Sequence, residues 1–267
     1  MTATPIPRTL AMSHYANLDL SIIDEYPAGR QPVTTALISR DRRDEVIESI
    51  RKACVEGRQV YWVCTLIEES ENFDLQAAEL AASELSLALP ELQVGLLHGR
   101  MKASEKDAVM DDFRAGNTQL LVSTTVIEVG VDVANASLMI IENPERLGLA
   151  QLHQLRGRVG RGEDQSHCIL LYGTPLSDHA RERLKAMRQT GNGFELAEID
   201  LRLRGPGELL GSRQTGDVGY RIADLMRDQD LLAQAKQNAC LLQKQFPQEA
   251  KLLVARWIHR AQDYHSV

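Results

Sequence analysis

Short apolar runs alternate with amphipathic segments between residues 33 and 172, and this alternation limits the chain to one class of fold. Residues 120–123 and 138–141 are nearly continuous apolar runs, which is typical of strands buried on both faces of a parallel sheet. Residues 44–56 carry apolar side chains at helical spacing. Because such strands and helices follow one another repeatedly, the sequence predicts an α/β fold, with a parallel sheet flanked by helices.

The individual elements follow from the same pattern and from helix-stop signals. Strands are expected at 20–23, 33–38, 60–64, 93–97, 120–123, 138–141 and 168–172. Helices are expected at 44–56, 74–89, 104–114, 149–155, 178–189, 193–203, 222–245 and 249–264. From about residue 176 no further strand is expected, so the chain divides into a sheet domain and a C-terminal helical region.

Two local signals refine these bounds. Pro27, Ala28 and Gly29 indicate a break, and we expect a linker at 26–33. Ser104 and Asp107 have the spacing of a capping box, in which two side chains satisfy backbone amides at the start of a helix.

The segment 154–162 reads Gln-Leu-Arg-Gly-Arg-Val-Gly-Arg-Gly and lies between an expected helix and the last expected strand. Arginine cannot lose its charge, and its planar fork of donors matches phosphate oxygens. Arg158 and Arg161 in a short glycine-rich turn therefore suit the stabilisation of charge on a transferring phosphoryl group.

A phosphate cradle of the usual kind is absent from the sequence. The pattern requires a Gly-Lys dipeptide, and none occurs. An acidic pair, Asp24 and Glu25, follows the stretch Thr2-Ala3-Thr4-Pro5, and we interpret it as a solvated strand end. We expect the chain to open in the middle of a larger protein.

Composition excludes several other classes. The net charge of −7 argues weakly against a nucleic-acid partner. Four scattered cysteines without Cys-x-x-Cys spacing predict no zinc site. Three of them lie in apolar helical or strand contexts and fit reduced core residues of a cytosolic protein. The sequence has no run of 18 consecutive apolar residues, so we expect no membrane span.

Together these motifs carry a resemblance to a known family. Residues 154–162 resemble motif VI of the superfamily 2 helicases, and Thr2-Ala3-Thr4-Pro5 resembles the segment that couples ATP hydrolysis to DNA movement. Residues 95–101, 124–133, 193–201, 204–211 and 213–216 resemble the RecG branch. The last three of these stretches look like the translocation motif that RecG shares with the transcription-repair coupling factor.

This resemblance implies a RecA-like sheet followed by a helical-hairpin translocation motif. Residues 1–32 would be the tail of a first RecA-like motor domain plus a linker, 33–175 the second RecA-like domain, and 176–267 the hairpin, its loop and C-terminal helices. The family implies a monomeric ATP-driven translocase on double-stranded DNA that remodels stalled replication forks and branched junctions. It also implies a bacterial, cytoplasmic and nucleoid-associated setting, and Mg²⁺ with ATP. The wedge domain and the first motor domain would lie outside this chain, so we expect the chain alone to lack ATP hydrolysis.

The resemblance also assigns site residues. In the ATP cleft it places Gln154, Gly130 and Asp132 beside the catalytic Arg158 and Arg161. It assigns a role in DNA contact or translocation to seven residues: His98, Arg100, Thr124, Thr125, Arg183, Arg204 and Gln214. No metal ligand is assigned.

Each role has a structural alternative. Arg158 and Arg161 could have no role beyond binding acidic neighbours such as Glu163 and Asp164. Gln154 could lie on a surface helix. The threonine pair could cap a helix. In the same way, His98 could be a turn residue, and the segment around Gln214 a plain glycine-rich connector.

Three functions remain open at this point. The first is the motor part of a RecG-like helicase. The second is a fragment of the coupling factor, which Pro206-Gly207-Glu208 disfavours. The third is a free-standing DNA-binding or regulatory module without enzymatic activity.

Overall fold

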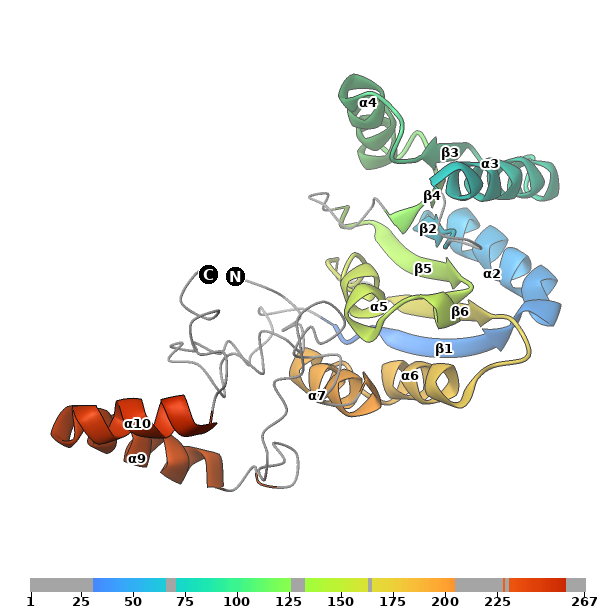
Figure 1. The fold of residues 1–267 in the computed structure, drawn as a ribbon. Coiled ribbons are helices and arrows are strands. Elements are labelled where there is room, and N and C mark those ends of the chain that lie inside the picture. Colours follow the sequence, from blue (N-terminus) through green and yellow to red (C-terminus); the bar gives the residue numbers. More distant parts are fainter. Residues whose placement is uncertain are drawn as a thin grey trace. The chain divides into compact units, whose positions relative to one another are not determined.

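The computed structural model describes residues 31–65, 71–125, 133–162, 165–204, 228 and 231–257. Within them six strands form one parallel sheet in the order β1-β6-β5-β2-β4-β3 (Figure 1). The strands are β1 Thr34–Ser39, β2 Gln59–Val63, β3 Val94–Leu97, β4 Leu120–Ser123, β5 Ala136–Glu142 and β6 His167–Tyr172. The predicted parallel α/β sheet is therefore confirmed.

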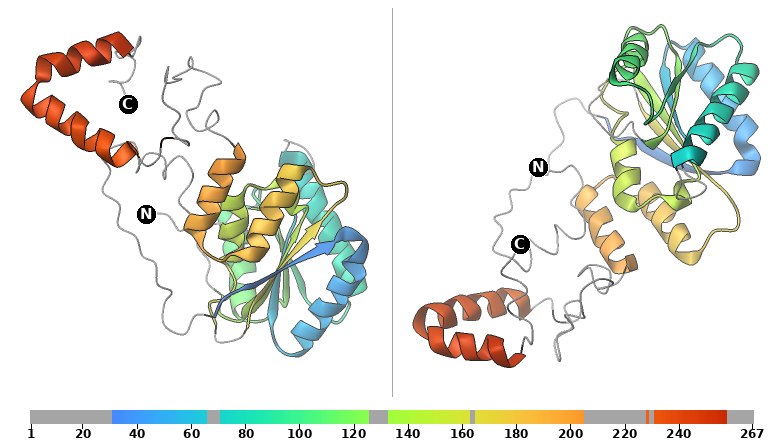
Figure 2. Two further views of the ribbon diagram at one scale, coloured as in Figure 1. Left: turned by 90° about the horizontal axis from the view of Figure 1, so that it is seen from below. Right: turned by 45° about the horizontal axis from the view of Figure 1, so that its top comes forward.

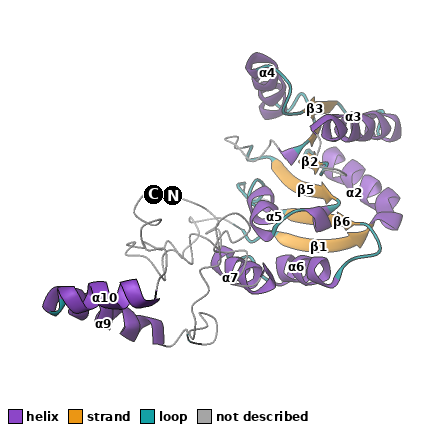
Figure 3. Ribbon diagram, viewed as in Figure 1, coloured by secondary structure: helices purple, strands orange, loops and turns teal. Residues whose placement is uncertain are grey.

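Helices connect the strands and continue beyond them (Figure 3). The α-helices are α2 Arg43–Val55, α3 Glu71–Ala88, α4 Ala103–Arg114, α5 Leu149–Arg156, α6 Asp178–Gln189, α7 Gly193–Arg204, α9 Leu232–Gln245 and α10 Pro247–Trp257. Two short 3₁₀ helices, η1 Arg40–Arg42 and η3 Pro144–Arg146, follow the ends of β1 and β5. In the described parts of the chain no helix is long and apolar enough to cross a membrane.

The sheet separates two apolar layers (Figure 2). One layer packs α2 and α3 onto the sheet through residues such as Ile50 and Leu85. The opposite layer packs α4, α5 and α6 through residues such as Phe113, Leu152 and Leu184. All five residues of β2 are buried, because its side chains alternate between the two layers. This explains why the central strands read as continuous apolar runs.

The chain divides into two compact units. The first holds the sheet and its helices up to Leu203. The second includes α9 and α10, which contact each other as a helical pair. Pro247 opens α10, where its missing amide hydrogen costs no helical hydrogen bond.

Some sequence expectations need correction or lie outside the described residues. The capping box at Ser104 and Asp107 is wrong: α4 begins at Ala103, and Glu105 accepts a hydrogen bond from the backbone amide of Lys102 at 2.9 Å. The same spacing occurs two residues earlier, and the turn from His98 to Met101 decides where the helix starts. The expected strand 20–23 and the first part of the expected helix 222–245 are outside the described residues.

Candidate functional site

The carboxyl ends of the strands meet at one edge of the sheet. The register pairs Ser123 at the end of β4 with both Leu97 and Val63, and Val63 with Ile141. Loops that follow β2, β3, β4 and β5 therefore start side by side. In open α/β sheets, ligands bind beyond this edge. Four of the predicted site residues, His98, Arg100, Thr124 and Thr125, leave the sheet here.

Helix α5 carries the arginine-rich segment and packs firmly on the sheet. Leu149, Leu152 and Leu155 are fully buried in the apolar layer. At the start of α5, the amide of Gly148 donates to the side chain of Gln151 at 3.3 Å. The helix ends at Arg156, and the glycine-rich turn begins immediately after it. The arginines are therefore presented from the end of a fixed helix.

Arg156 is buried, with 4% of its surface exposed. Its Nη1 donates to the carbonyl oxygens of Met187 and Thr190, both at 2.8 Å, and its Nη2 lies 2.9 Å from Nδ1 of His153. The carbonyls at the end of a helix lack partners within it, and they favour a positive charge. Arg156 thus joins the end of α5 to the turn between α6 and α7.

No role was predicted for Arg156 from the sequence. A signal for it was present: Arg156 follows Leu149 by seven residues and Leu152 by four, which places it on the buried face of α5. A charged residue on such a face has to find acceptors.

Arg158 and Arg161 differ from Arg156 in exposure: Arg158 is half-buried and Arg161 is exposed. The Nε of Arg161 donates to the carbonyl of Gly157 at 3.2 Å, which returns the side chain to the end of α5. Glu163 and Asp164, the acidic neighbours that could hold these arginines, lie outside the described residues. The catalytic role of Arg158 and Arg161 stays a prediction.

The turn that carries these arginines is packed tightly against other parts of the chain. Gly160 has φ +78°, and a Cβ there would lie 2.7 Å from Cγ2 of Val33. A Cβ on Gly162 would collide with the carbonyl oxygen of Ala134. Both positions need glycine, because one requires a left-handed backbone and the other a close approach. The backbone of the turn is therefore fixed, and this suits guanidinium groups that must meet a phosphate at a defined place.

The loops after β3 and β4 hold the predicted DNA-contact residues. His98 is half-buried, and its Nδ1 atom is buried without a hydrogen-bond partner among the described residues. Arg100 is exposed. Thr124 is 5% exposed, and its amide donates to the carbonyl of Leu97 at 3.2 Å, whereas Thr125 is half-buried. The sheet thus brings these four residues to one edge.

The remaining predicted residues fall into two groups. Arg183 on α6 is half-buried, and its Nη2 donates to the carbonyl of Glu145 in η3 at 2.7 Å. It thereby holds α6 against the connection that leads into α5. Gln154 on α5 is half-buried. Gly130, Asp132, Gln214 and the side chain of Arg204 lie outside the described residues.

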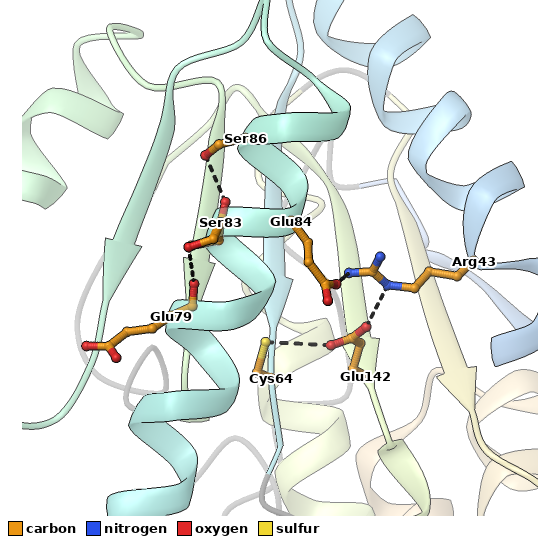
Figure 4. Close-up of polar contacts among 8 residues, drawn as sticks. Arg43, Cys64, Glu79, Ser83, Glu84, Ser86 and Glu142 are labelled. Carbon is orange, nitrogen blue, oxygen red and sulfur yellow. Dashed lines mark hydrogen bonds and ion pairs between the residues drawn. The ribbon is translucent and has the colours of Figure 1, made fainter.

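A second polar cluster lies where β2 and β5 end (Figure 4). Arg43 bonds to the carboxylates of Glu142 and Glu84, each at 3.1 Å, and lies over the ring of Trp62 at 5.2 Å. The Cys64 thiol donates to Glu142 at 3.7 Å. Burial, and then the nearby Glu142 carboxylate, raise the pKa of Cys64 well above its ordinary value.

Two family models match this chain. The helicase conserved C-terminal domain matches residues 38–163, and the model "ATP-dependent DNA helicase RecG, domain 3, C-terminal" matches residues 190–256. Both matches agree with the sheet unit and the helical region described above.

Curated relatives and a solved structure with similar sequences also carry the name RecG. The chain is 62% identical over 265 residues to the ATP-dependent DNA helicase RecG of Escherichia coli O157:H7, covering 99% of this chain and 38% of that protein. It is 48% identical over 243 residues to the Bacillus subtilis RecG, covering 91% of this chain and 36% of that protein. A structure of RecG bound to a three-way DNA junction matches with a TM-score of 0.68 and 47% identity, over 87% of this chain and 30% of that one.

The chain therefore spans about 38% of the length of its Escherichia coli relative. The arginine-bearing helix α5 lies inside the first match, and helices α7 and α9 lie inside the second. This chain belongs to the RecG family of superfamily 2 helicases, as a C-terminal portion.

Proposed function

We propose that this chain is the second motor domain and translocation hairpin of an ATP-driven translocase on double-stranded DNA. Its task is to remodel stalled replication forks and branched recombination intermediates in DNA repair. The observation that carries the proposal is the contact of Arg156 with Met187 and Thr190. We assign the hairpin to helices α6 and α7. Because the Arg156 side chain ties the arginine-bearing helix α5 to the turn between them, a movement of α5 is passed directly to both helices.

In this proposal ATP lies across a cleft between this domain and a first motor domain supplied outside the chain. Arg158 and Arg161 reach the phosphates, with Gln154, Gly130 and Asp132 beside them. Bound ATP with Mg²⁺ supplies the phosphoanhydride whose hydrolysis drives the motor, and the first domain holds the metal. An arginine in such a position raises the hydrolysis rate by about 10³–10⁵.

Double-stranded DNA lies along the edge where β3 and β4 end. Arg100 contributes charge to the phosphate backbone, and His98, Thr124 and Thr125 contribute hydrogen-bond donors. Arg204 and Gln214, together with Arg183 in the hairpin, turn closure of the ATP cleft into a stroke on DNA. The whole protein works as a monomer in the bacterial cytoplasm, near the nucleoid, with a wedge domain that recognises the branch point.

The first test is ATP hydrolysis by the 267-residue chain, with and without a branched DNA duplex. We expect no turnover from the chain alone. We expect DNA-stimulated turnover once the preceding part of the Escherichia coli relative is added. Turnover by the chain alone would contradict the proposal, because a complete nucleotide site would then lie within it. DNA binding without restored turnover would favour a DNA-binding or regulatory module.

The second test separates the arginine from general charge effects. Arg161→Ala should abolish turnover in the reconstituted protein while DNA binding is retained. Arg114→Ala is the matched control, because Arg114 is exposed at the end of α4 and pairs only with its neighbour Asp111 in the described structure. Retained turnover in Arg161→Ala would remove this residue from the ATP site.

A further inference from the structure

A short connection, residues 143–148, leads from β5 into the arginine-bearing helix α5. It includes η3 and only a few residues on either side. Whatever holds this connection also holds the start of α5, and the far end of α5 leads into the turn with Arg158 and Arg161. The contacts that hold it and the end of β5 come from four parts of the chain: Thr65 after β2, strand β6, and helices α6 and α2.

Thr65 provides the most direct of these contacts. It follows the end of β2 and is 2% exposed. Its Oγ1 lies 2.7 Å from the carbonyl oxygen of Glu142 and 3.0 Å from that of Asn143. A hydroxyl has one proton, so the two carbonyl oxygens share one donor. Thr65 is thus the donor at the point where β5 ends.

Asn143 explains why a donor is needed there. Its backbone has φ 48° and ψ 48°, and it is the one non-glycine residue with positive φ in the described parts of the chain. This left-handed conformation is disfavoured for residues with a side chain, although asparagine tolerates it better than most. Such a backbone persists where surrounding contacts hold it. Here the turn sends the chain from β5 toward η3 and α5.

The other contacts support different parts of the same connection. The amide of Asn143 donates to the carbonyl of Leu171 in β6 at 3.0 Å. Arg183 donates to the carbonyl of Glu145, and Arg43 holds the carboxylate of Glu142. Among these donors the Thr65 hydroxyl is the one that lies within hydrogen-bond distance of the carbonyls before and after the left-handed residue Asn143.

We propose that Thr65 is a positioning residue for the arginine pair. Its hydroxyl fixes the left-handed turn at Asn143, and this turn sets the start of α5 and the direction of Arg158 and Arg161. Thr65 itself touches neither ATP nor DNA in this role. The effect on turnover rests on the proposed function, whereas the effect on α5 does not.

The test compares Thr65→Val with Thr65→Ser. Valine keeps the shape of threonine and removes the hydroxyl, whereas serine keeps the hydroxyl and removes the methyl group. Amide hydrogen exchange is measured on the intact 267-residue chain at Leu152, Gly157 and Arg158, whose amides bond within and just after α5. We expect about tenfold faster exchange at these amides in Thr65→Val, as for the loss of one buried hydrogen bond. Serine should restore the original rates.

Ser137→Ala is the matched control. Ser137 is a 3% exposed hydroxyl on β5, far from its carboxyl end, and has no hydrogen-bond partner among the described residues. It should leave exchange in α5 unchanged. Unchanged exchange in Thr65→Val would overturn the proposal. Equal acceleration in β3 and α4 would also overturn it, since this would indicate a general loss of stability.

Turnover in the reconstituted protein gives a second, separate readout. Thr65→Val should lower kcat for ATP about tenfold or more with KM nearly unchanged, because misdirected arginines weaken the transition state more than substrate binding. Faster exchange with normal turnover would overturn the positioning of the arginines. If even the unaltered protein shows no turnover, the proposed function fails, and the exchange result still decides whether Thr65 holds α5.

Discussion

Arg156 at the end of α5 donates a hydrogen bond to the carbonyl oxygen of Thr190, the residue that caps α6, at 2.8 Å. The two residues are 34 positions apart in the sequence. Their contact makes the arginine-bearing helix and the hairpin turn parts of one hydrogen-bonded unit. In the proposed function this connection matters, because the residues proposed for ATP and for DNA lie on different elements.

Replacing Arg156 with lysine should destabilise the sheet unit by about 1–3 kcal/mol. Lysine keeps the charge, but it lacks the planar fork that reaches the carbonyls of Met187 and Thr190 together. The free energy of unfolding, measured by urea titration, checks this. Arg114→Lys on the surface of α4 should change it by less than about 0.5 kcal/mol. Equal values for the two variants would show that the buried contacts contribute little.

Replacing Gly160 with alanine should cost more stability than the same change at Gly116. Both glycines have nearly the same backbone, with φ +78° and +80°. A Cβ at Gly116 meets nothing within 4 Å, whereas one at Gly160 meets the side chain of Val33. Gly116→Ala should therefore cost about 1–2 kcal/mol from the left-handed backbone alone. Thermal unfolding of both variants measures the extra cost of the contact, and no difference would mean that Val33 moves aside freely.

The two carboxylates bonded to Arg43 should differ in their contribution to stability (Figure 4). The side chain of Glu142 is 12% exposed and that of Glu84 is 61% exposed. Glu84→Gln should change the free energy of unfolding by no more than about 0.5 kcal/mol, because exposed ion pairs are screened by water. Glu142→Gln should cost about 1–3 kcal/mol, since charged hydrogen bonds are stronger in a partly buried site. Similar losses would indicate that burial does not govern this cluster.

The buried thiols predict a loss of stability at high pH. Burial raises the pKa of Cys54 to about 11 and that of Cys168 to about 12. In an unfolded chain these thiols ionise near pH 8.5. Below that pH both states keep the proton, so stability is unaffected. As pH rises toward 12 the unfolded chain releases protons that the folded chain retains, and the free energy of unfolding falls. Urea titrations from pH 8 to 11 should show a shallower decline for Cys168→Ala, and an unchanged decline would exclude this thiol as a cause.

Several features of this protein could be predicted from the sequence alone. Strands such as β4 and β5 are buried on both faces, so most of their residues are apolar, and this pattern identifies them without a structure. Helix stops followed from local signals, and so did the lack of strands among the described residues beyond 176. The glycine-arginine segment was recognisable because its chemistry depends on residue types at fixed, short spacings.

Other features depend on contacts between residues far apart in the sequence. The start of α4 was predicted at Ser104 but lies at Ala103, where the Glu105 carboxylate accepts a hydrogen bond from the amide of Lys102. The role of Thr65 could not be predicted, since its acceptors in Glu142 and Asn143 are reached only when β2 and β5 pair. Helical spacing sets Arg156 apart from Arg158 and Arg161, but it does not show which acceptors Arg156 meets. Only the packing of α5 against α6 buries Arg156 and leaves Arg161 exposed, because burial depends on which carbonyls the tertiary structure places within reach.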